Sequence, residues 1–247
     1  MGSPLAYGIQ RSKLIGNQNI YYHTPGKKEV PFHYLESNEV VVKTCDIIVL
    51  AVKPDVAAKV LLEIRQYASN KLLISICGGL NLKTLEEMVG VPTKIVRIMP
   101  NTPSLVGQGC LVFCGNIHVD ARDTQKVIDI FSACGVIQEI KEANMDIATA
   151  ISGCGPAYIF LFIESLIDAG VKNGLNRDVA KNLVLQTILG SIHLVKASSQ
   201  PIQQLKDDVC TPHGISIAGL CTLEKHAFKY AVMDAVESAY KKSKSMH

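Results

Sequence analysis

The chain has 247 residues, of which 48% are apolar, so it can bury a sizeable core as one large domain or two small ones. Its net charge of +3 is too small to favour nucleic acid or a membrane as a partner. The eight cysteines include no CxxC pair, which argues against a metal site and a disulfide framework. Reduced thiols favour the cytoplasm, and no signal peptide or membrane-spanning run is visible.

The first part of the chain alternates between apolar strands and amphipathic helices. Residues 1–16 place Leu5, Ile9 and Leu14 on one helix face. The runs at 45–52 and 72–77 are continuously apolar, which is typical of parallel strands covered on both faces. The alternation predicts βαβ units around a parallel sheet. The pattern predicts further strands at 19–23, 94–99, 110–114 and 135–140, and helices at 36–43, 56–67, 82–89 and 123–134.

The pattern changes after Glu142, where strand-like segments end and only helical periodicity follows. The expected helical runs cover 146–170, 177–197, 201–209 and 214–246. This shift predicts an α/β domain at 1–143 and an all-α domain at 144–247.

One stretch, residues 151–175, dominates the helical part. Its start, Ser152–Pro156, contains two glycines and a proline, which predicts a tight turn before a helix. The helix is apolar nearly all round, so we expect burial on most faces, and it is too short and too charged to span a bilayer. Two interpretations stay open: it is the central helix of an all-α core, or its glycine-rich start borders a ligand.

Three predicted strands end in residues that suit a ligand site. They are followed by Val52-Lys53-Pro54, by Gly78-Gly79 and by a segment that includes Asn101. Ligands of α/β sheets lie beyond the carboxyl ends of the strands. Each segment alone could be an ordinary turn, but the three together favour a nucleotide.

An NAD-binding domain usually carries an acidic residue at the end of its second strand, where it binds the ribose. This sequence has no carboxylate at that position. It holds His23–Gly26, followed by Lys27 and Lys28, which could attract a 2′-phosphate. This favours NADPH, with NADH as the alternative donor. The other interpretation is that both lysines are solvated surface residues.

A second candidate site lies in the loop at 207–216. Gly214, Ile215 and Ser216 begin the last helical run, where unpaired N–H groups can hold an anion such as a carboxylate. Thr211 and Ser216 add hydroxyl groups. Simple N-capping is the alternative, and His213 is better interpreted as a loop residue than as an acid.

These motifs together resemble the pyrroline-5-carboxylate reductase family over essentially the whole chain. The segments that carry the resemblance are DIIVLAVKP (46–54), RIMPNTP (97–103), SGCGPAY (152–158), DAGVKNGL (168–175) and QLKDDVCTPHGISIAGLCTLE (204–224). The resemblance implies a Rossmann-like dinucleotide-binding domain followed by a helical dimerisation and substrate-binding domain. It also implies homodimers, which in this family often build decamers.

The resemblance further implies an enzyme of proline biosynthesis. Its reaction would be hydride transfer from NADPH or NADH to the C=N bond of 1-pyrroline-5-carboxylate, giving L-proline. Ser216 would be the catalytic residue, bonded to the ring nitrogen, and the implied substrate-binding residues are Glu142, Thr211, Gly214, Ile215 and Ser216. Together with the strand ends, the candidate cofactor-binding residues are Gly2, Ser3, Asn38, Ala51, Val52, Lys53, Gly78 and Asn101.

Three features depart from the family pattern. The family begins with a strand and a GxGxMG turn, of which Met1-Gly2 matches only the end. We therefore expect two open strand edges, weak NADPH binding and a less stable first domain. His213 replaces a glycine, so a positive φ there would cost strain. Asp208 stands where asparagine is common.

Two rival functions stay open. A β-hydroxyacid dehydrogenase needs a lysine with an asparagine one turn later, whereas Lys172 and Asn173 are adjacent and face different directions. The other rival is a non-catalytic, dimeric remnant of the family that no longer holds a dinucleotide.

Overall fold

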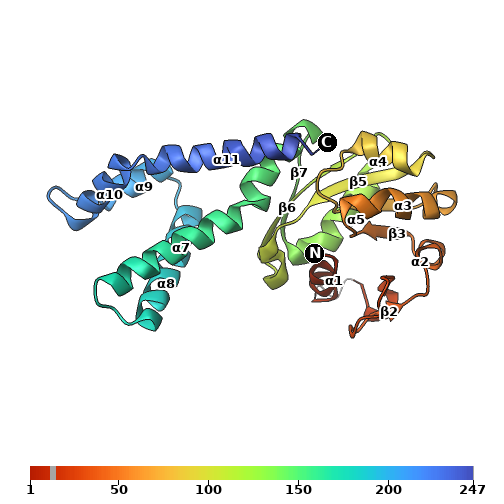
Figure 1. The fold of residues 1–247 in the computed structure, drawn as a ribbon, viewed down its shortest axis with the longest axis horizontal. Coiled ribbons are helices and arrows are strands. Elements are labelled where there is room, and N and C mark those ends of the chain that lie inside the picture. The colour runs from red at the N-terminus through yellow and green to blue at the C-terminus, as the bar shows by residue number, and fades with distance from the viewer. Residues whose placement is uncertain (12–14, 247) are drawn as a thin grey trace. The chain divides into compact units, whose positions relative to one another are not determined.

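The computed structural model describes residues 1–11 and 15–246, so the predicted helix-face residue Leu14 lies outside the described part. The chain forms two compact units (Figure 1). Unit 1 comprises Met1–Pro156 with Ser238–His247, and unit 2 comprises Ala157–Glu237. The last strand of the sheet ends at Glu139, and the predicted boundary at 143/144 stays a prediction.

Unit 1 is built on a five-stranded sheet with the order β3-β4-β5-β6-β7. Its strands are β3 (Ile47–Leu50), β4 (Leu72–Ser75), β5 (Lys94–Met99), β6 (Gly109–Gly115) and β7 (Gly135–Glu139). The first three are parallel, as predicted, whereas β6 runs antiparallel to β5 and parallel to β7. Residues 100–108 explain the reversal, because a parallel crossover needs a dozen or more residues.

Helices cover both faces of this sheet (Figure 1). They are α1 (Gly2–Arg11), α3 (Pro54–Ile64), α4 (Leu82–Val89) and α5 (Ala121–Phe131). Side chains of β4 alternate between two apolar cores, since successive strand residues point to opposite faces. Leu73 packs in the core that includes Leu61 of α3, whereas Ile74 packs in the core that includes Leu5 and Phe131.

Two short strands stand apart from the main sheet. β1 (Tyr21–Tyr22) and β2 (His33–Tyr34) pair only with each other among the described residues, and β3 is an edge strand of the main sheet. Open strand edges therefore occur in unit 1, and their origin in a missing first strand stays a prediction. The predicted effects on NADPH affinity and stability stay predictions.

The helix starts of unit 1 follow from side-chain caps. Ser37 accepts from the Val40 amide, Asn81 accepts from the Thr84 amide, and Asp120 forms a capping box with Asp123. The remaining helices of the sheet region are α2 (Asn38–Thr44), η1 (Asn17–Asn19), η2 (Arg65–Tyr67), η3 (Thr102–Val106) and η4 (Ser132–Cys134).

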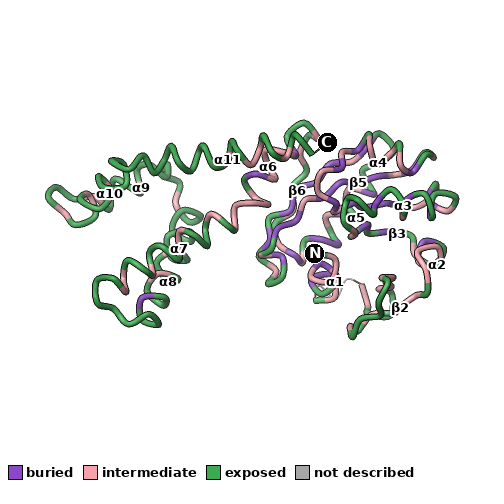
Figure 2. Tube along the Cα trace, in the orientation of Figure 1, coloured by how far each residue is buried: buried purple, intermediate pink, exposed green. Residues whose placement is uncertain are grey.

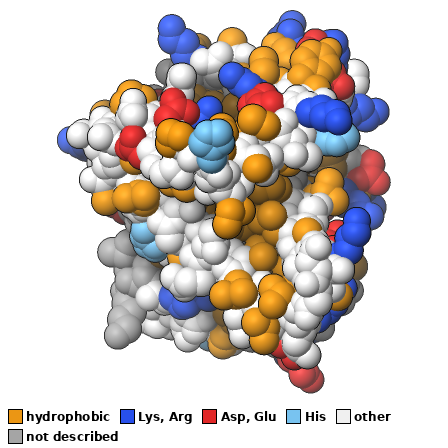
Figure 3. All heavy atoms as spheres, turned by 90° about the vertical axis from the view of Figure 1, so that its left-hand side faces the viewer, with side chains coloured by type: hydrophobic (Ala, Val, Ile, Leu, Met, Phe, Trp, Pro, Cys, Tyr) orange, Lys and Arg blue, Asp and Glu red, His pale blue; other side chains and the backbone are white. Residues whose placement is uncertain are grey.

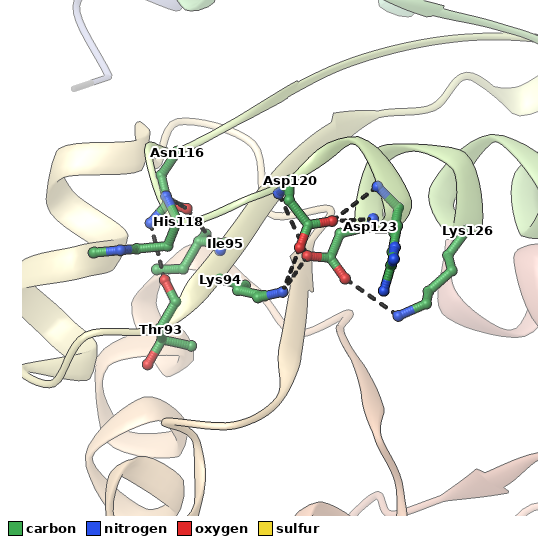
Figure 4. A network of polar contacts seen from close by, with 9 residues as sticks. Thr93, Lys94, Ile95, Asn116, His118, Asp120, Asp123 and Lys126 are labelled. Carbon is green, nitrogen blue, oxygen red and sulfur yellow. Dashed lines mark hydrogen bonds and ion pairs between the residues drawn. The ribbon is translucent and has the colours of Figure 1, made fainter.

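The start of α5 carries a network of charged groups (Figure 4). Lys94 of β5 donates to Asp123 at 2.5 Å and to Asp120 at 3.1 Å, and Lys126 donates to Asp123 at 3.3 Å. The Asp123 amide and Lys94 lower the pKa of Asp120 to about 2. Burial opposes ionisation of Asp123, but Lys94 and Lys126 still lower its pKa. The network fastens α5 to the sheet.

We expect Asp123→Asn to lower the free energy of unfolding at neutral pH by roughly 1–3 kcal/mol, because the buried Asp123 carboxylate is the charged acceptor for both Lys94 and Lys126. Both lowered pKa values mean that the network stabilises the fold above the unfolded pKa of about 4 and that this contribution is lost as the pH falls toward 2. Denaturant melts should therefore show the variant and the wild type converging across that window. The exposed Asp129 on the same helix provides the control, Asp129→Asn, and an equal loss there would contradict the prediction.

The predicted tight turn at Ser152–Pro156 is wrong. The chain instead continues as one helix, Glu142–Lys172, through η5 (Glu142–Asn144), α6 (Met145–Ala148), the π-helical η6 (Thr149–Gly153) and α7 (Gly155–Lys172). The Cys154 amide bonds the Thr149 carbonyl, five residues back, and Pro156 has no amide to donate to the Ser152 carbonyl. By length and composition this helix could cross a membrane, so the prediction that it is too short and too charged to span a bilayer is wrong.

Unit 2 consists of α-helices with little internal burial (Figure 2). Its helices are the rest of α7, α8 (Arg177–Ala197), α9 (Ile202–Asp208), α10 (Ile215–Lys225) and most of α11 (Phe228–Lys244). Ala180 is its one buried hydrophobic residue among those described, so the predicted burial of α7 within the chain is wrong. The predicted run 214–246 is broken at Ala227, whose φ of 52° ends the helical path.

Candidate functional site

Several candidate cofactor residues of unit 1 follow the carboxyl ends of parallel strands. Ala51, Val52 and Lys53 connect β3 to α3, and Lys53 is the N-cap of that helix. A Cβ atom on Gly2 would lie 2.9 Å from the Cβ of Ala51, so only glycine lets the start of α1 approach this strand end. Ser3 follows in the first turn of α1. The structure thus brings together two chain segments that are far apart in the sequence.

A thiol joins the ends of β3 and β4. Cys77 donates from Sγ to the Val52 carbonyl at 3.2 Å, and burial raises its pKa, so the thiol stays protonated as a donor. Sequence reasoning missed Cys77; its position directly before Gly78 was the available signal. A Cβ on Gly78 would meet one atom within 4 Å, Met99 Cε at 3.9 Å, so its backbone has an open face.

Asn38 and the turn after β1 both precede β3 in the sequence. Asn38, the first residue of α2, donates to Glu63 Oε2 at 3.0 Å. The turn that carries Lys27 and Lys28 is closed by Tyr22, whose hydroxyl donates to the Lys28 carbonyl at 2.8 Å and accepts from the Lys28 amide at 3.1 Å. Both lysines are exposed. An ordered turn with two exposed ammonium groups can attract a phosphate.

Asn101 is buried and already bonded on both sides of its amide. Its Nδ2 donates to the Ser152 carbonyl at 2.9 Å, and its Oδ1 accepts from the Cys110 amide at 3.0 Å. The Ser152 carbonyl is the one that Pro156 leaves without an intrahelical donor. Asn101 therefore braces the end of β5 against β6 and the π-helical turn.

Glu142 is bonded within unit 1. Its Oε1 accepts from the Leu82 amide at 2.5 Å, at the start of α4, and lies 3.7 Å from Nη1 of the buried Arg97. An acceptor at the first turn of a helix satisfies one of the open amides there. A pocket of about 390 Å³ lies beside this pair, and its lining residues are Asn81, Lys83, Arg97, Glu142, Ala143 and Asp146.

The candidate substrate residues form the loop before α10 in unit 2. Gly214 is the N-cap, without a side-chain cap bond, and its amide bonds the Thr211 carbonyl at 2.9 Å. His213 adopts a φ of 59°, so the expected strain is present. Ile215 and Ser216 are exposed in the first turn. The turn therefore offers open amides and a hydroxyl to an anion.

Comparison with known proteins finds relatives for both the sheet part and the helical part of the chain. A family profile described as "Pyrroline-5-carboxylate reductase dimerisation" matches residues 142–246, and one described as "NADP oxidoreductase coenzyme F420-dependent" matches residues 1–79. The pyrroline-5-carboxylate reductase of pea (Pisum sativum) is 36% identical over 100% of this chain and 92% of its own length. The chain belongs to the pyrroline-5-carboxylate reductase family. The Escherichia coli reductase is 34% identical over 100% of this chain and 94% of its own.

A solved structure adds the match in three dimensions. The Plasmodium falciparum pyrroline carboxylate reductase with NADP bound is 60% identical, with a TM-score of 0.96 over 100% of this chain and 94% of that one. The predicted family, the two-part fold and the class of NAD(P)H-dependent oxidoreductase are confirmed. The family assignment sets aside the β-hydroxyacid dehydrogenase alternative.

Proposed function

We propose that the protein transfers a hydride from NAD(P)H to the C=N bond of 1-pyrroline-5-carboxylate, giving L-proline as the last step of proline biosynthesis. The observation that carries the proposal is the first turn of α10, which begins at Gly214 without a side-chain cap and carries an exposed Ser216 hydroxyl. Such a turn suits a substrate that has a carboxylate beside a ring nitrogen.

The strand ends of unit 1 fit a dinucleotide, because Gly2 lets the start of α1 lie against Ala51 and the Gly78 backbone has an open face. When bound, the nicotinamide supplies the hydride. The residues proposed to hold the dinucleotide are Gly2, Ser3, Asn38, Ala51, Val52, Lys53, Gly78 and Asn101. The NADP bound in the Plasmodium falciparum relative supports this.

The protein's own part in the reaction is positioning. Amides of Ile215 and its neighbours would hold the carboxylate, and Ser216 would hydrogen-bond the ring nitrogen, with Thr211 and Glu142 as further contacts. A protonated imine is already electrophilic, so alignment of the two reactants can supply most of the rate.

NADPH is the preferred donor in this proposal, with NADH as the weaker alternative. The support is the turn after β1, where Lys27 and Lys28 are exposed and Tyr22 holds the backbone. A 2′-phosphate would gain from both ammonium groups, whereas the NADH ribose would not.

We propose that the protein forms a homodimer through the helical domain, residues 144–247. Such dimers could assemble further into a decamer. Exposed apolar side chains cover the helices of unit 2, for example Phe160 at 61%, Leu161 at 64% and Met233 at 61%. Figure 3 shows hydrophobic side chains gathered on one face of the molecule. Apolar surface of this extent is typical of a protein interface. The eight free cysteines favour the reducing cytoplasm as the location.

We expect Ser216→Ala to lower turnover with pyrroline-5-carboxylate on the order of tenfold, because one hydrogen bond to a charged nitrogen is lost. Affinity for NADPH, measured by fluorescence titration, should stay close to the wild-type value. Ser216→Thr keeps the hydroxyl and should retain most activity. Weaker NADPH binding with unchanged turnover would place Ser216 elsewhere, and a wild-type protein without turnover at high enzyme concentration would favour the non-catalytic alternative.

A further inference from the structure

The C-terminal residues of the chain pack onto the turn that follows β4. This turn carries Gly78, a proposed cofactor-binding residue, and Gly79, whose φ of 77° is in the left-handed region. A Cβ on Gly79 would lie 3.3 Å from both Cβ and Cε of Met246 and 3.5 Å from its carbonyl oxygen. Met246 thus covers one side of the turn with its backbone and its side chain.

A second contact fixes the same end of the chain. Ser243, in the last turn of α11, donates to Asp146 Oδ1 of α6 at 2.7 Å. The Met246 amide bonds the Ser243 carbonyl at 3.1 Å, so the chain folds back tightly between the two contacts. All of these residues belong to unit 1, although the sequence separates Gly79 from Met246 by more than half of the chain.

The far side of the turn is held independently. Glu142 bonds the Leu82 amide at the start of α4 and pairs with Arg97 of β5. Cys77 bonds Val52 directly before the turn. The turn therefore lies between residues that are held by hydrogen bonds, and Met246 packs on Gly79.

We propose that two residues, Ser243 and Met246, form a C-terminal clamp that positions the Gly78–Gly79 turn for the dinucleotide. Met246 and Ser243 are positioning residues in this proposal, which rests on the proposed cofactor site. A glycine turn without side chains of its own is costly to order on binding, because glycine loses more conformational freedom than other residues. Contact with Met246 restricts the turn in advance, and such preorganisation raises affinity.

The test uses the full chain with Met246→Ala and Ser243→Ala, and with Lys244→Ala as the matched control. Lys244 is exposed in the same helical turn, and its amino group lies over the Tyr240 ring rather than on the β4 turn. We expect Met246→Ala to raise the NADPH Kd on the order of fivefold with kcat nearly unchanged, as expected for lost preorganisation. Ser243→Ala should act in the same direction, and Lys244→Ala should resemble the wild type.

Hydrogen exchange of the peptide covering residues 76–84, measured without cofactor, is the second readout. Met246→Ala should speed exchange at the turn, whereas Lys244→Ala should not. Unchanged exchange overturns the clamp, and so does faster exchange with an unchanged NADPH Kd. If the wild-type protein binds no NADPH, the proposed function fails, and the positioning role fails with it even where exchange shows the contact.

Discussion

Gly135→Ala should lower the free energy of unfolding by at least about 3 kcal/mol, because it combines backbone strain with a clash against backbone. Gly135 has a φ of 142° and pairs with Gly109 where β7 meets β6. A Cβ on Gly135 would press against the carbonyl oxygen and amide nitrogen of Gly109, well inside van der Waals contact. Neither strand can move apart without losing its ladder bonds, so the cost cannot relax away.

Two other glycines separate the causes. Gly90 ends α4 with a φ of 68°, and the nearest atom to its Cβ position lies at 3.8 Å, so Gly90→Ala should cost about 1 kcal/mol from strain alone. Gly26 has no atom within 4 Å and should tolerate alanine. Thermal and denaturant melts of the three variants measure the loss of unfolding free energy, which should be largest for Gly135→Ala and smallest for Gly26→Ala. A Gly135→Ala protein as stable as Gly90→Ala would show that β6 and β7 separate easily.

Leu185→Lys with Leu189→Lys should convert the proposed dimer into monomer. The two leucines lie four residues apart on one stripe of α8, with exposures of 43% and 50% in the single chain. If a second copy covers this stripe, each leucine contributes about 2 kcal/mol of burial, and both copies lose it. Sedimentation at micromolar concentration should show the change, and turnover should fall if the dimer holds the substrate loop in place.

The control adds a lysine on the same helix without removing either leucine. Thr187 lies between the two leucines in the sequence and is exposed on the opposite side of α8, so Thr187→Lys should remain dimeric. A wild-type protein that sediments as a monomer would contradict the proposed dimer. A double variant that stays dimeric would show that the interface lies on other residues of unit 2.

Much of the fold follows from local patterns in the sequence. The continuous apolar run of β4 and the period of α4 predict those elements directly, and the residues that cap α4 are of the type that helix starts prefer. Strand ends at Val52, Gly78 and Asn101 could be named in advance, because parallel strands place their carboxyl ends at one edge. The resemblance of the motifs led to the family, which the comparisons confirm.

Other features depend on contacts between distant residues. In the π-helical turn at Thr149–Gly153, the Ser152 carbonyl accepts a hydrogen bond from the Asn101 side chain, which lies 51 residues away in the sequence. A glycine-proline pattern by itself suits a tight turn equally well. The role of Asn101 as a brace could not be read from its place after a strand, because hydrogen-bond partners are set by tertiary contacts.

The sequence by itself determined the alternation of strands and helices, the change to helices after Glu142, and the residue types at the strand ends, because these depend on periodicity and local backbone preference. The tertiary structure alone decided the reversal of β6, the Cys77 bond between strand ends, and the packing of Met246 on Gly79. It also decided that α7 is exposed in the single chain. Those outcomes depend on which distant surfaces meet, and an apolar helix has the same sequence pattern whether its own chain or a second one covers it.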